Sequence, residues 1–497
     1  MSTALLRLLL LLGTTALSAF AADATTTREK TLRFPEEVRR NASYSEVDPD
    51  PDYRHASPAA YAAFRAMKFG VRIHWGLYSL LPQSRESWTF LELSDVERQR
   101  YFASAQQWNP TAFDAEGWMK FFERAGFRTF AITTKHHEGF SLWATHTRVV
   151  RRSNFTLPGG PGIEPCDVAY SVMETPFKRD IIKELTDAAH RRDIKVNLYF
   201  SHTDWYDADF RPYGRHPLQF AGSSGIKSLE ERQKRPAPLV HAPTAEERAH
   251  RVARHRAQLR ELLTRYGKVD MVCLDIALGQ EDWPDVKATI KELRRLQPDV
   301  MFRNRGIGNY GDYHTPERVV PNEATANPMP WMVIYPLGSH FSYEADAAKH
   351  KGAQWVIDNL VDSVAKGGNF MVGIGPDGTG RFHPTAIAQL EEVGAWLQVN
   401  GEAIFNTHAR AADAWKDGEH VRLTAGDDGR HTYAIALRRP TSSLRLSTVR
   451  AAERARITLL GHPQPLAWRQ TSAGLVIDFP ATAPTSLAYA LKIETTR

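Results

Sequence analysis

Residues 180–201, DIIKELTDAAHRRDIKVNLYFS, join a helical pattern to a strand pattern. Asp180 stands directly before apolar residues at helical spacing, which predicts a helix over 180–191 with Asp180 as its N-terminal cap. The apolar run Lys195–Ser201 follows after a short turn and predicts a strand. A helix that leads at once into a strand is the repeating unit of an α/β fold.

The same alternation extends in both directions, from about residue 60 to about residue 400. Predicted strands are Phe69–Trp75, Arg128–His136, Lys195–Ser201, Val269–Asp275, Val300–Arg305, Met332–Tyr335 and Asn369–Ile374. Predicted helices are Asp114–Ala125, Asp180–Arg191, Ala245–Tyr266, Asp285–Leu296, Ala353–Ala365 and Thr385–Val399. This alternation predicts a parallel sheet, and its length favours a closed (β/α)8-type barrel.

Two parts of this region depart from the repeat. Strand–helix pairing is least clear between residues 300 and 350, so helices of the ideal barrel are expected to be missing there. The stretches 140–178 and 203–243 are predicted to be long loops, rich in Pro, Gly, Asp and aromatic residues. Loops of this length inside a domain usually carry function.

The beginning of the chain has the features of a secretory signal peptide. Arg7 precedes the apolar run Leu8–Leu12, and the segment ends in the small-x-small site Ala19-Phe20-Ala21. We expect residues 1–21 to be removed and the protein to be exported, to the periplasm or the medium. The apolar run is too short to predict a membrane span.

The remaining chain divides into three predicted parts. Residues 22–60 form a polar lead-in, residues 61–404 the barrel, and residues 405–497 a small antiparallel β-sandwich. The last part is predicted from short β-prone runs separated by turn signals such as Asp427-Asp428-Gly429.

The composition is that of a soluble globular protein, with 42% hydrophobic and 24% charged residues among 497. The net charge of +6 is small and its basic residues are spread along the chain, which argues against a nucleic-acid partner. Cys166 and Cys273 form no disulfide framework, and Cys273 is expected to be a small buried hydrophobe. Composition does not determine the oligomeric state.

Hydrogen-bonding side chains follow five predicted strands in succession. In a barrel, the C-terminal ends of the strands face the active site. The five ends are Ile73-His74-Trp75-Gly76, Thr134-Lys135-His136-His137-Glu138, Leu198-Tyr199-Phe200-Ser201-His202, Cys273-Leu274-Asp275 and Arg303-Asn304-Arg305. Such a set suits a hydroxyl-rich ligand such as a sugar.

Asp275 is the strongest candidate for a catalytic nucleophile. It follows the apolar run Val269–Leu274, and neighbouring His and Arg side chains would keep it ionised. Cleavage of a glycosidic bond also needs a second carboxyl group, about 5 Å away in a retaining enzyme. A structural salt bridge is the alternative role for Asp275.

Four motifs resemble glycoside hydrolase family 29, the α-L-fucosidases, in their order along the chain. The first is Phe69-Gly70-Val71-Arg72-Ile73-His74-Trp75-Gly76, and the second is Thr133-Thr134-Lys135-His136-His137-Glu138-Gly139-Phe140. The others are Gly367-Gly368-Asn369-Phe370 with Ile374-Gly375-Pro376, and Gly394 to Asn400-Gly401-Glu402-Ala403-Ile404. The resemblance implies an exo-acting, retaining α-L-fucosidase that needs no metal or cofactor and acts on fucosylated glycans or polysaccharides.

The resemblance also assigns roles to single residues. Asp275 would form a fucosyl–enzyme intermediate, and Trp88 would pack on the sugar. The residues that would bind the fucose hydroxyls or border the nucleophile are His74, His136, His137, Tyr199 and Arg305. A metal site at His136-His137 is the alternative, but neighbours on a strand point to opposite faces and could not easily share one ion.

Two positions depart from the family pattern. Cys273 stands where a Trp is common, and Met332 stands where the pattern predicts the Glu of a Trp-Glu pair that acts as acid/base. Because Met cannot donate a proton, we expect the acid elsewhere: Glu86 first, then Glu323, with Glu138 as a further candidate. Two other hypotheses stay open, a hydrolase of a related sugar such as an α-L-galactoside and a glycan-binding barrel without catalysis.

Overall fold

A computed structural model describes residues 46, 48–81, 84–219, 243–321, 329–411 and 414–495. The predicted signal peptide, most of the predicted lead-in and the acid candidate Glu323 lie outside these ranges. In the described parts of the chain, no helix combines the length and the apolar character that a membrane span needs.

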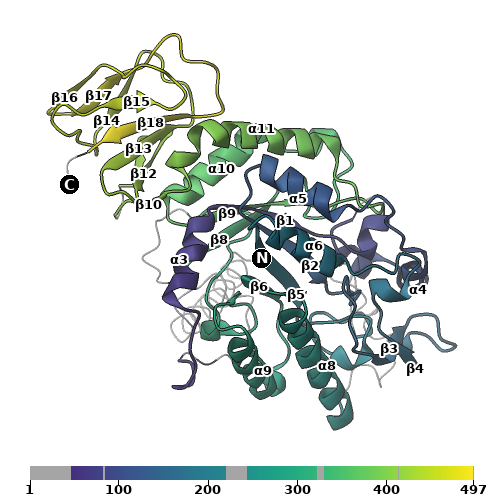
Figure 1. The fold of residues 1–497 in the computed structure, drawn as a ribbon. Helices are drawn as coiled ribbons and strands as arrows, with labels where there is room; N and C mark the ends of the chain where they lie inside the picture. The colour runs from purple at the N-terminus through teal and green to yellow at the C-terminus, as the bar shows by residue number, and fades with distance from the viewer. Residues whose placement is uncertain are drawn as a thin grey trace, which may run out of the picture.

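The centre of the molecule is a curled sheet of seven parallel strands in the order β7-β6-β5-β2-β1-β9-β8 (Figure 1). The strands are β1 (Phe69–Ile73), β2 (Thr129–Lys135), β5 (Lys195–Ser201), β6 (Met271–Asp275), β7 (Met301–Phe302), β8 (Met332–Pro336) and β9 (Asn369–Ile374). Each was predicted from the sequence, because each is an apolar run that is buried nearly throughout. The barrel-type α/β fold is confirmed.

The two edges of this sheet, β7 and β8, are joined by the segment Asp312–Arg318. The amide of Asp312 donates to the carbonyl of Phe302 (2.7 Å), and the amide of Arg318 donates to the carbonyl of Ile334 (2.9 Å). Single parallel bridges link Arg303 to Tyr313, His314 to Trp331 and Glu317 to Ile334. We call residues 312–318 the closing segment, because it occupies the place of the eighth barrel strand.

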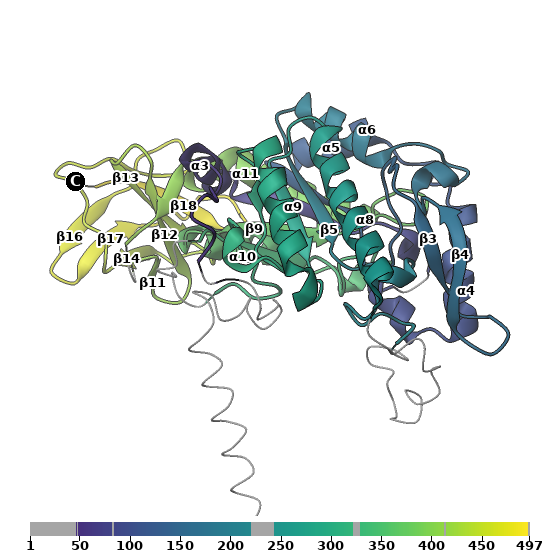
Figure 2. The same cartoon turned by 90° about the horizontal axis from the view of Figure 1, so that it is seen from below.

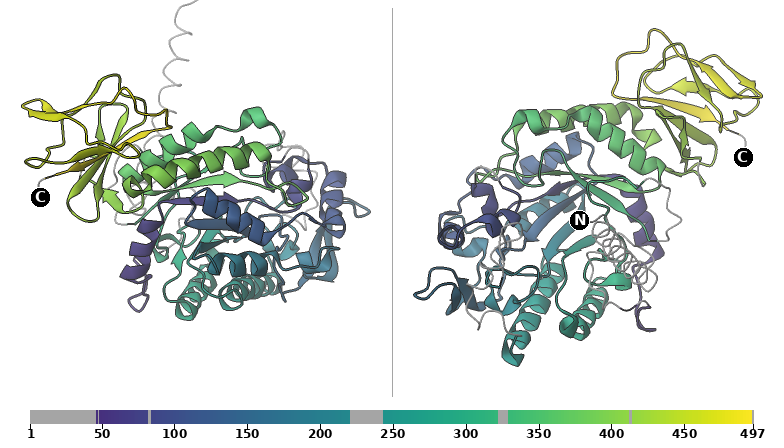
Figure 3. Two further views of the ribbon diagram at one scale, coloured as in Figure 1. Left: turned by 45° about the horizontal axis from the view of Figure 1, so that its top comes forward. Right: turned by 180° about the vertical axis from the view of Figure 1, so that it is seen from behind.

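Helices cover the outer face of the sheet, as the alternation predicts (Figures 1 and 3). They are α5 (Ala115–Arg124), α6 (Ile181–His190), α8 (Ala245–Thr264), α9 (Trp283–Leu296), α10 (Ala353–Ala365) and α11 (Pro384–Asn400). Among the described residues between α9 and α10 there is no α-helix, in agreement with the poor pairing expected over residues 300–350.

A further helix, α3 (Pro58–Met67), spans the predicted boundary between the lead-in and the barrel, where the sequence predicts no element. Ser57 caps it, and Phe64 and Met67 are buried against the barrel interior. They belong to one apolar cluster inside the barrel that includes the first residues of three strands, Met271, Met301 and Met332, together with Ala131, Tyr313, Ile334, Phe341 and Met371. This helix therefore closes the end of the barrel opposite to the predicted site.

Both long loops contain more regular structure than the sequence indicates. The first holds a hairpin of β3 (Val149–Asn154) and β4 (Gly162–Val168), and α4 (Asp95–Ala103) lies near it (Figure 2). The second contains a short 3-10 turn, Ala208–Phe210. A bridge between Arg152 and Asp207 connects the two loops. The sequence predicts long loops here without these elements, because charged residues interrupt the alternation of the hairpin strands.

The C-terminal residues form two antiparallel sheets, β10-β12-β13-β18-β15 and β14-β17-β16, around their own apolar core (Figures 2 and 3). The strands are β10 (Thr407–Ala409), β11 (Lys416–Asp417, paired with β12), β12 (Val421–Gly426), β13 (His431–Ala436), β14 (Ser443–Leu446), β15 (Ile457–Leu459), β16 (Trp468–Thr471), β17 (Gly474–Asp478) and β18 (Tyr489–Glu494). Arg422 pairs with Asp362 of α10 (2.5 Å), and the indole N–H of Trp396 in α11 donates to the carbonyl of Ala488 (2.9 Å). These contacts fix the sandwich to the two last barrel helices.

Candidate active site

Asp275, the last residue of β6, is surrounded by donors from three neighbouring parts of the barrel. The hydroxyl of Tyr199 donates to its Oδ2 (2.7 Å), and Nη1 of Arg305 donates to its Oδ1 (2.7 Å). Nη1 of Arg303 lies 3.6 Å from Oδ1, and Nε2 of His137 lies 4.0 Å from Oδ2. The side chain is 12% exposed, so one edge of the carboxylate is open.

The charges around Asp275 decide its protonation. Burial alone would raise the pKa of this carboxyl, but Arg305, Arg303 and the hydrogen bond from Arg305 hold it well below its ordinary value. Asp275 is therefore ionised throughout the neutral range, as the sequence leads us to expect. An ionised carboxylate on a rigid strand end is what a nucleophile requires.

Three histidines and Tyr199 form a cluster of rings beside Asp275. The rings of His74 and His136 are 5.5 Å apart, and His136 stacks on Tyr199 at 5.3 Å with an angle of 10° between the planes. The rings of His136 and His137 are 4.1 Å apart. The structure thus brings together His74, His136, His137, Tyr199, Asp275 and Arg305, which the sequence places on separate strand ends.

The expectation that His136 and His137 point to opposite faces is wrong. Strand β2 ends at Lys135, and its pairing with β5 is irregular between Thr133 and Lys135. Both histidines therefore follow the strand instead of continuing its alternation, and their rings lie side by side. In the described ranges, no three His, Cys, Asp or Glu side chains gather as ligands of a metal ion would.

The three histidines are neutral, because burial lowers their pKa. The pKa of His137 falls to about 4, and those of His74 and His136 lie well below the ordinary value. Hydroxyl groups fix two of the rings: Ser87 Oγ bonds His136 Nδ1, and Ser201 Oγ bonds His137 Nδ1 at 2.7 Å. Neutral imidazoles can both donate to and accept from sugar hydroxyls.

Trp88 stands at the edge of the same cluster. Its ring contacts His137 (4.7 Å between centroids) and Trp205 (5.7 Å), both edge-on. Trp88 is partly exposed, whereas Trp205 is fully buried. A partly exposed indole beside a group of hydrogen-bonding rings can offer an apolar surface to a sugar.

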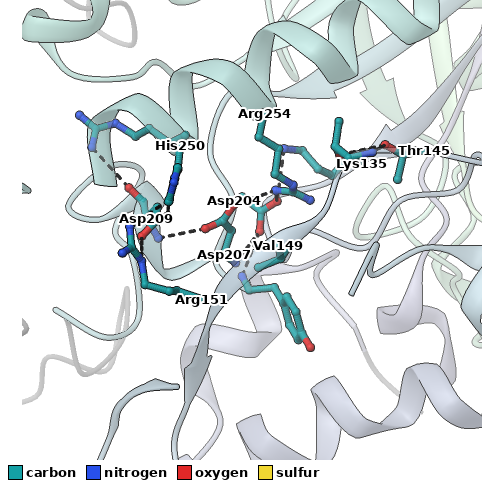
Figure 4. A network of polar contacts seen from close by, with 12 residues as sticks. Lys135, Thr145, Val149, Arg151, Asp204, Asp207, Asp209, His250 and Arg254 are labelled. Carbon is teal, nitrogen blue, oxygen red and sulfur yellow. Dashed lines mark hydrogen bonds and ion pairs between the residues drawn. The ribbon is translucent and has the colours of Figure 1, made fainter. Parts of the chain in front are cut away.

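A buried ion network supports this side of the site (Figure 4). Arg254 of α8 bonds Asp204 (2.7 Å) and Asp207 (3.2 Å), and Lys135 lies 3.5 Å from Asp204. Trp205, which follows Asp204 in the sequence, donates its amide to the carbonyl of His137 (2.8 Å). Gly139 has a φ of +91°, and a Cβ there would come within 2.1 Å of Asp204, so the motif requires glycine at this position. The network thereby fixes His137 and Trp205 together.

Glu86, the first candidate for the acid, is buried in a strained turn with a φ of +51°. Its Oε1 accepts the amides of Phe341 (2.6 Å) and Ser342 (2.9 Å). Burial raises the pKa of Glu86 to about 7 against these two hydrogen bonds. The pKa suits an acid, but half of the carboxyl group is already bound to the backbone of the 341–342 turn.

Glu317 is a carboxyl group that the sequence reasoning missed. Its Oε2 accepts from Nη2 of Arg305 (2.9 Å), while Nη1 of the same guanidinium binds Asp275. The side chain is 22% exposed. Glu317 is the next-to-last residue of the closing segment and Asp275 is the last residue of β6, so both carboxylates lie near the C-terminal end of a barrel position. The signal in the sequence was a Glu twelve residues beyond Arg305, before β8.

The other acid candidates are less favourably placed or not described. Glu323 lies outside the described residues. Glu138 is buried below His136, with Oε2 3.9 Å from its Nδ1, and burial raises its pKa to about 8. Met332 belongs to the apolar cluster at the closed end of the barrel. A Glu at this position would face the closed end of the barrel and not Asp275. The carboxyl group arranged beside Asp275 is Glu317, which binds the same guanidinium.

Comparison of the sequence with family profiles identifies the family to which the chain belongs. A family profile described as "Alpha-L-fucosidase" matches residues 38–402, and one described as "Alpha-L-fucosidase C-terminal domain" matches residues 416–494. The chain belongs to the α-L-fucosidase family. It is therefore a glycoside hydrolase, and the resemblance stated from its motifs is confirmed.

Individual relatives span most of the chain at low identity. The plasma α-L-fucosidase of Rattus norvegicus is 27% identical over 449 residues, covering 84% of this chain and 87% of the relative. The plasma α-L-fucosidase of Homo sapiens is 26% identical, covering 84% and 85%. Among solved structures, α-L-fucosidase isoenzyme 1 from Paenibacillus thiaminolyticus has a TM-score of 0.72 at 26% identity, covering 88% of this chain and 99% of that one.

Proposed function

We propose that this chain is a retaining, exo-acting hydrolase of terminal α-L-fucosides, with Asp275 as nucleophile and Glu317 as acid/base. One observation carries the proposal: the two carboxylates bind neighbouring nitrogens of the Arg305 guanidinium. Oxygens held in this way lie within a few ångströms of each other. That agrees with the spacing of about 5 Å that retention needs.

In the first step, an oxygen of Asp275 attacks the anomeric carbon and forms a glycosyl ester. The bond between this carbon and the glycosidic oxygen breaks, and the oxygen takes the proton of Glu317. In the second step, Glu317 removes a proton from water, the water oxygen bonds the anomeric carbon, and the ester bond breaks to release Asp275. The two inversions leave the sugar in its original α configuration.

Glu317 suits the acid role better than Glu86 because of its position. Glu317 shares Arg305 with the nucleophile, whereas Glu86 is bound to backbone amides of the 341–342 turn. Burial would raise the pKa of Glu317, but Arg305 and Arg303 lower it to about 2 in the unliganded protein, against the effect of Asp275. We expect a bound sugar to displace water and to raise this pKa, so that Glu317 takes up the proton it donates.

The sugar itself would be held by the ring cluster. His74, His136 and His137 supply neutral donors and acceptors for hydroxyl groups, and Trp88 offers an apolar face for the C–H side of the ring. No charged group of the sugar is needed for this binding. The natural substrate would accordingly carry a neutral sugar at its end, and family membership makes this sugar the fucose of a fucosylated glycan or polysaccharide.

A relative supports the two-step reaction. A structure of an α-L-fucosidase from Bacteroides thetaiotaomicron, with a TM-score of 0.70 and 24% identity over 90% of this chain and 99% of that one, holds a trapped covalent intermediate with 2-fluoro-fucosyl fluoride. The predicted signal peptide and the likeness to plasma α-L-fucosidases support an exported enzyme.

The first experiment tests the nucleophile. We expect hydrolysis of an aryl α-L-fucoside with α-L-fucose as the first product by NMR, and a loss of about 10⁴-fold or more in kcat/KM for Asp275→Gly. Azide should restore part of this activity and yield the β-fucosyl azide, because it can enter the space of the removed carboxylate and attack the anomeric carbon from that face. Asp270→Asn, which affects a carboxylate just before β6 that binds the amide of Val196, is the matched control.

Two outcomes would overturn this part of the proposal. An α-L-galactoside cleaved faster than every α-L-fucoside of a panel would assign another sugar. Fucose binding without hydrolysis of any fucoside, including fucosyl fluoride, would make the chain a glycan-binding barrel.

A second experiment separates the two acid candidates. Glu317→Gln should lower kcat/KM by about 10³-fold for an aryl fucoside with a poor leaving group and by little for fucosyl fluoride, which needs no protonation. Glu86→Gln should lower both by a similar, smaller factor. The reverse pattern would assign the acid to Glu86.

A further inference from the structure

A cysteine and two arginines lie together inside the barrel, directly below the nucleophile. Nη1 of Arg72 from β1 donates to Sγ of Cys273 (3.2 Å), and Nη1 of Arg303, which follows β7, donates to the same sulfur (3.4 Å). All three residues are at most 3% exposed. Cys273 and Asp275 are two residues apart on β6, so their side chains share the inner face of the barrel.

The positive charge of this layer is not balanced by carboxylates. Among the described residues, no carboxylate lies within ion-pair distance of Arg72, and Arg303 reaches only Asp275, at 3.6 Å. Asp275 in turn is already bound by Arg305. Nε of Arg72 and both Nε and Nη2 of Arg303 are buried and have no hydrogen-bond partner in the described parts. Burying two guanidinium groups whose nearest carboxylate is already bound by a third guanidinium is costly.

We propose that Cys273 is a thiolate that serves as the counter-ion of Arg72 and Arg303, and that this charge adjusts the basicity of Asp275. Cys273 would thus be a positioning residue below the nucleophile instead of the small buried hydrophobe that the sequence suggests. The second half of the proposal rests on the proposed role of Asp275, while the first half does not.

The groups that face the sulfur come from five places in the barrel. Arg72 and Arg303 favour the thiolate, and Asp275 opposes it. Burial raises the pKa of the thiol, but the two arginines lower it below its ordinary value. The phenols of Tyr199 and Tyr313 also face Cys273, and burial keeps both neutral because their pKa lies well above the ordinary value.

The effect on Asp275 passes through Arg303. One nitrogen, Nη1, lies 3.4 Å from the sulfur of Cys273 and 3.6 Å from Oδ1 of Asp275. A negative sulfur shares this nitrogen with the carboxylate and adds a like charge below it. Without the thiolate, Arg303 would act on Asp275 alone, so the carboxylate would be more stabilised and less nucleophilic.

The first test measures the thiolate by its absorbance at 240 nm. Cys166 is the matched control, because burial raises its pKa to about 11 and its thiol is protonated at neutral pH. We expect Cys166→Ser, which keeps Cys273, to show the thiolate band at pH 7 and to lose it only in acid. Cys273→Ser, which keeps Cys166, should show no band at pH 7. A Cys166→Ser protein without the band up to pH 8 would overturn the proposal, whether or not the enzyme acts on fucosides.

The second test follows the pH dependence of hydrolysis. In Cys273→Ser, loss of a negative charge should move the acid limb of kcat/KM to lower pH by about one unit. We also expect kcat to fall several-fold with little change in KM, and Cys166→Ser to behave as wild type. An acid limb that stays in place or moves to higher pH would show a merely structural cysteine.

Discussion

The two carboxylates that share Arg305 are held by very different parts of the barrel. Asp275 ends β6, which pairs with β5 over five consecutive residues and is continued on its other side by β7. Glu317 lies near the end of the closing segment, which single bridges attach to β7 and β8. The nucleophile thus comes from a regular strand, and the proposed acid from an irregular one.

This difference fits what each group must do. An attacking oxygen forms a bond to carbon, so a small displacement costs much of the rate. An acid/base transfers a proton in both steps, to the leaving group and from water, and its carboxyl needs to serve two partners. The regular strand therefore carries the group that must be placed most accurately, Asp275, and the irregular segment carries the proton-transferring group, Glu317.

The largest expected effect comes from breaking the link between the two regions. Arg305→Met should lower kcat/KM by about 10³-fold, or roughly 4 kcal/mol, because two carboxylates would remain without their shared cation. Steady-state kinetics on an aryl fucoside measures this loss. Arg305→Lys should recover only part of it, since one ammonium cannot bind both carboxylates as a planar guanidinium does.

Arg295→Met, on the exposed face of α9, is the control and should leave the rate unchanged. A loss below tenfold in Arg305→Met would mean that the shared guanidinium contributes little to the reaction.

The next effect concerns the strand that accepts the closing segment. Met332 is 1% exposed among apolar side chains, so Met332→Glu should lower the free energy of unfolding by about 3 kcal/mol without adding activity. Urea unfolding measures the change. Met332→Leu, which keeps the volume, should cost less than about 1.5 kcal/mol. A stable and more active Met332→Glu enzyme would place this position at the site.

A smaller effect is expected from the pH dependence of stability at Glu86. The pKa of Glu86 is about 7 in the folded protein and 4.5 in its ordinary state, so the folded form holds the proton more tightly. The stability from this group is fully present below pH 4.5 and is lost as the pH rises through 7.

Glu86→Gln cannot titrate, so its unfolding free energy should fall less than that of wild type between pH 5 and pH 8. We expect a difference of about 2 kcal/mol in urea unfolding at the two pH values. Equal slopes for both proteins would contradict a raised pKa at this position.

The smallest effect lies on the nucleophile side alone. Tyr199→Phe removes one hydrogen bond from Asp275 and should lower kcat/KM about tenfold. Because that bond favours the charged carboxylate, its loss should raise the pKa of Asp275 and move the acid limb to higher pH, opposite to Cys273→Ser. Tyr335→Phe, whose ring contacts Trp355 of α10, is the control. A shift to lower pH would contradict this electrostatic account.

The sequence predicts the regular part of the barrel well because its strands are apolar and its helices amphipathic. The strand ends that meet at Asp275 follow from that pattern alone. The closing segment gives no such pattern: it contains Pro316, pairs through single bridges and is followed by no helix in the described residues before β8. For this reason Glu317 was missed, although Asp275 and Arg305 were found.

Charge pairing inside the barrel was equally hidden from the sequence. Cys273 looks like any small apolar residue of a strand, and only the approach of Arg72 from β1 and of Arg303 from the end of β7 gives its sulfur a role. Similarly, the bulge that turns His136 and His137 to the same side depends on the pairing of β2 with β5. Both features arise from contacts between strands and not from local periodicity.

The described residues that join the closing segment to β8 include no helix, and this has a consequence for how such enzymes diverge. Insertions or deletions between β6 and β7 must preserve α9, which packs against α8. Between Glu317 and β8 the described residues contain no helix that a change in length would displace. Descendants of one ancestor can therefore keep the attacking aspartate in a constant place while the proton donor is relocated or replaced.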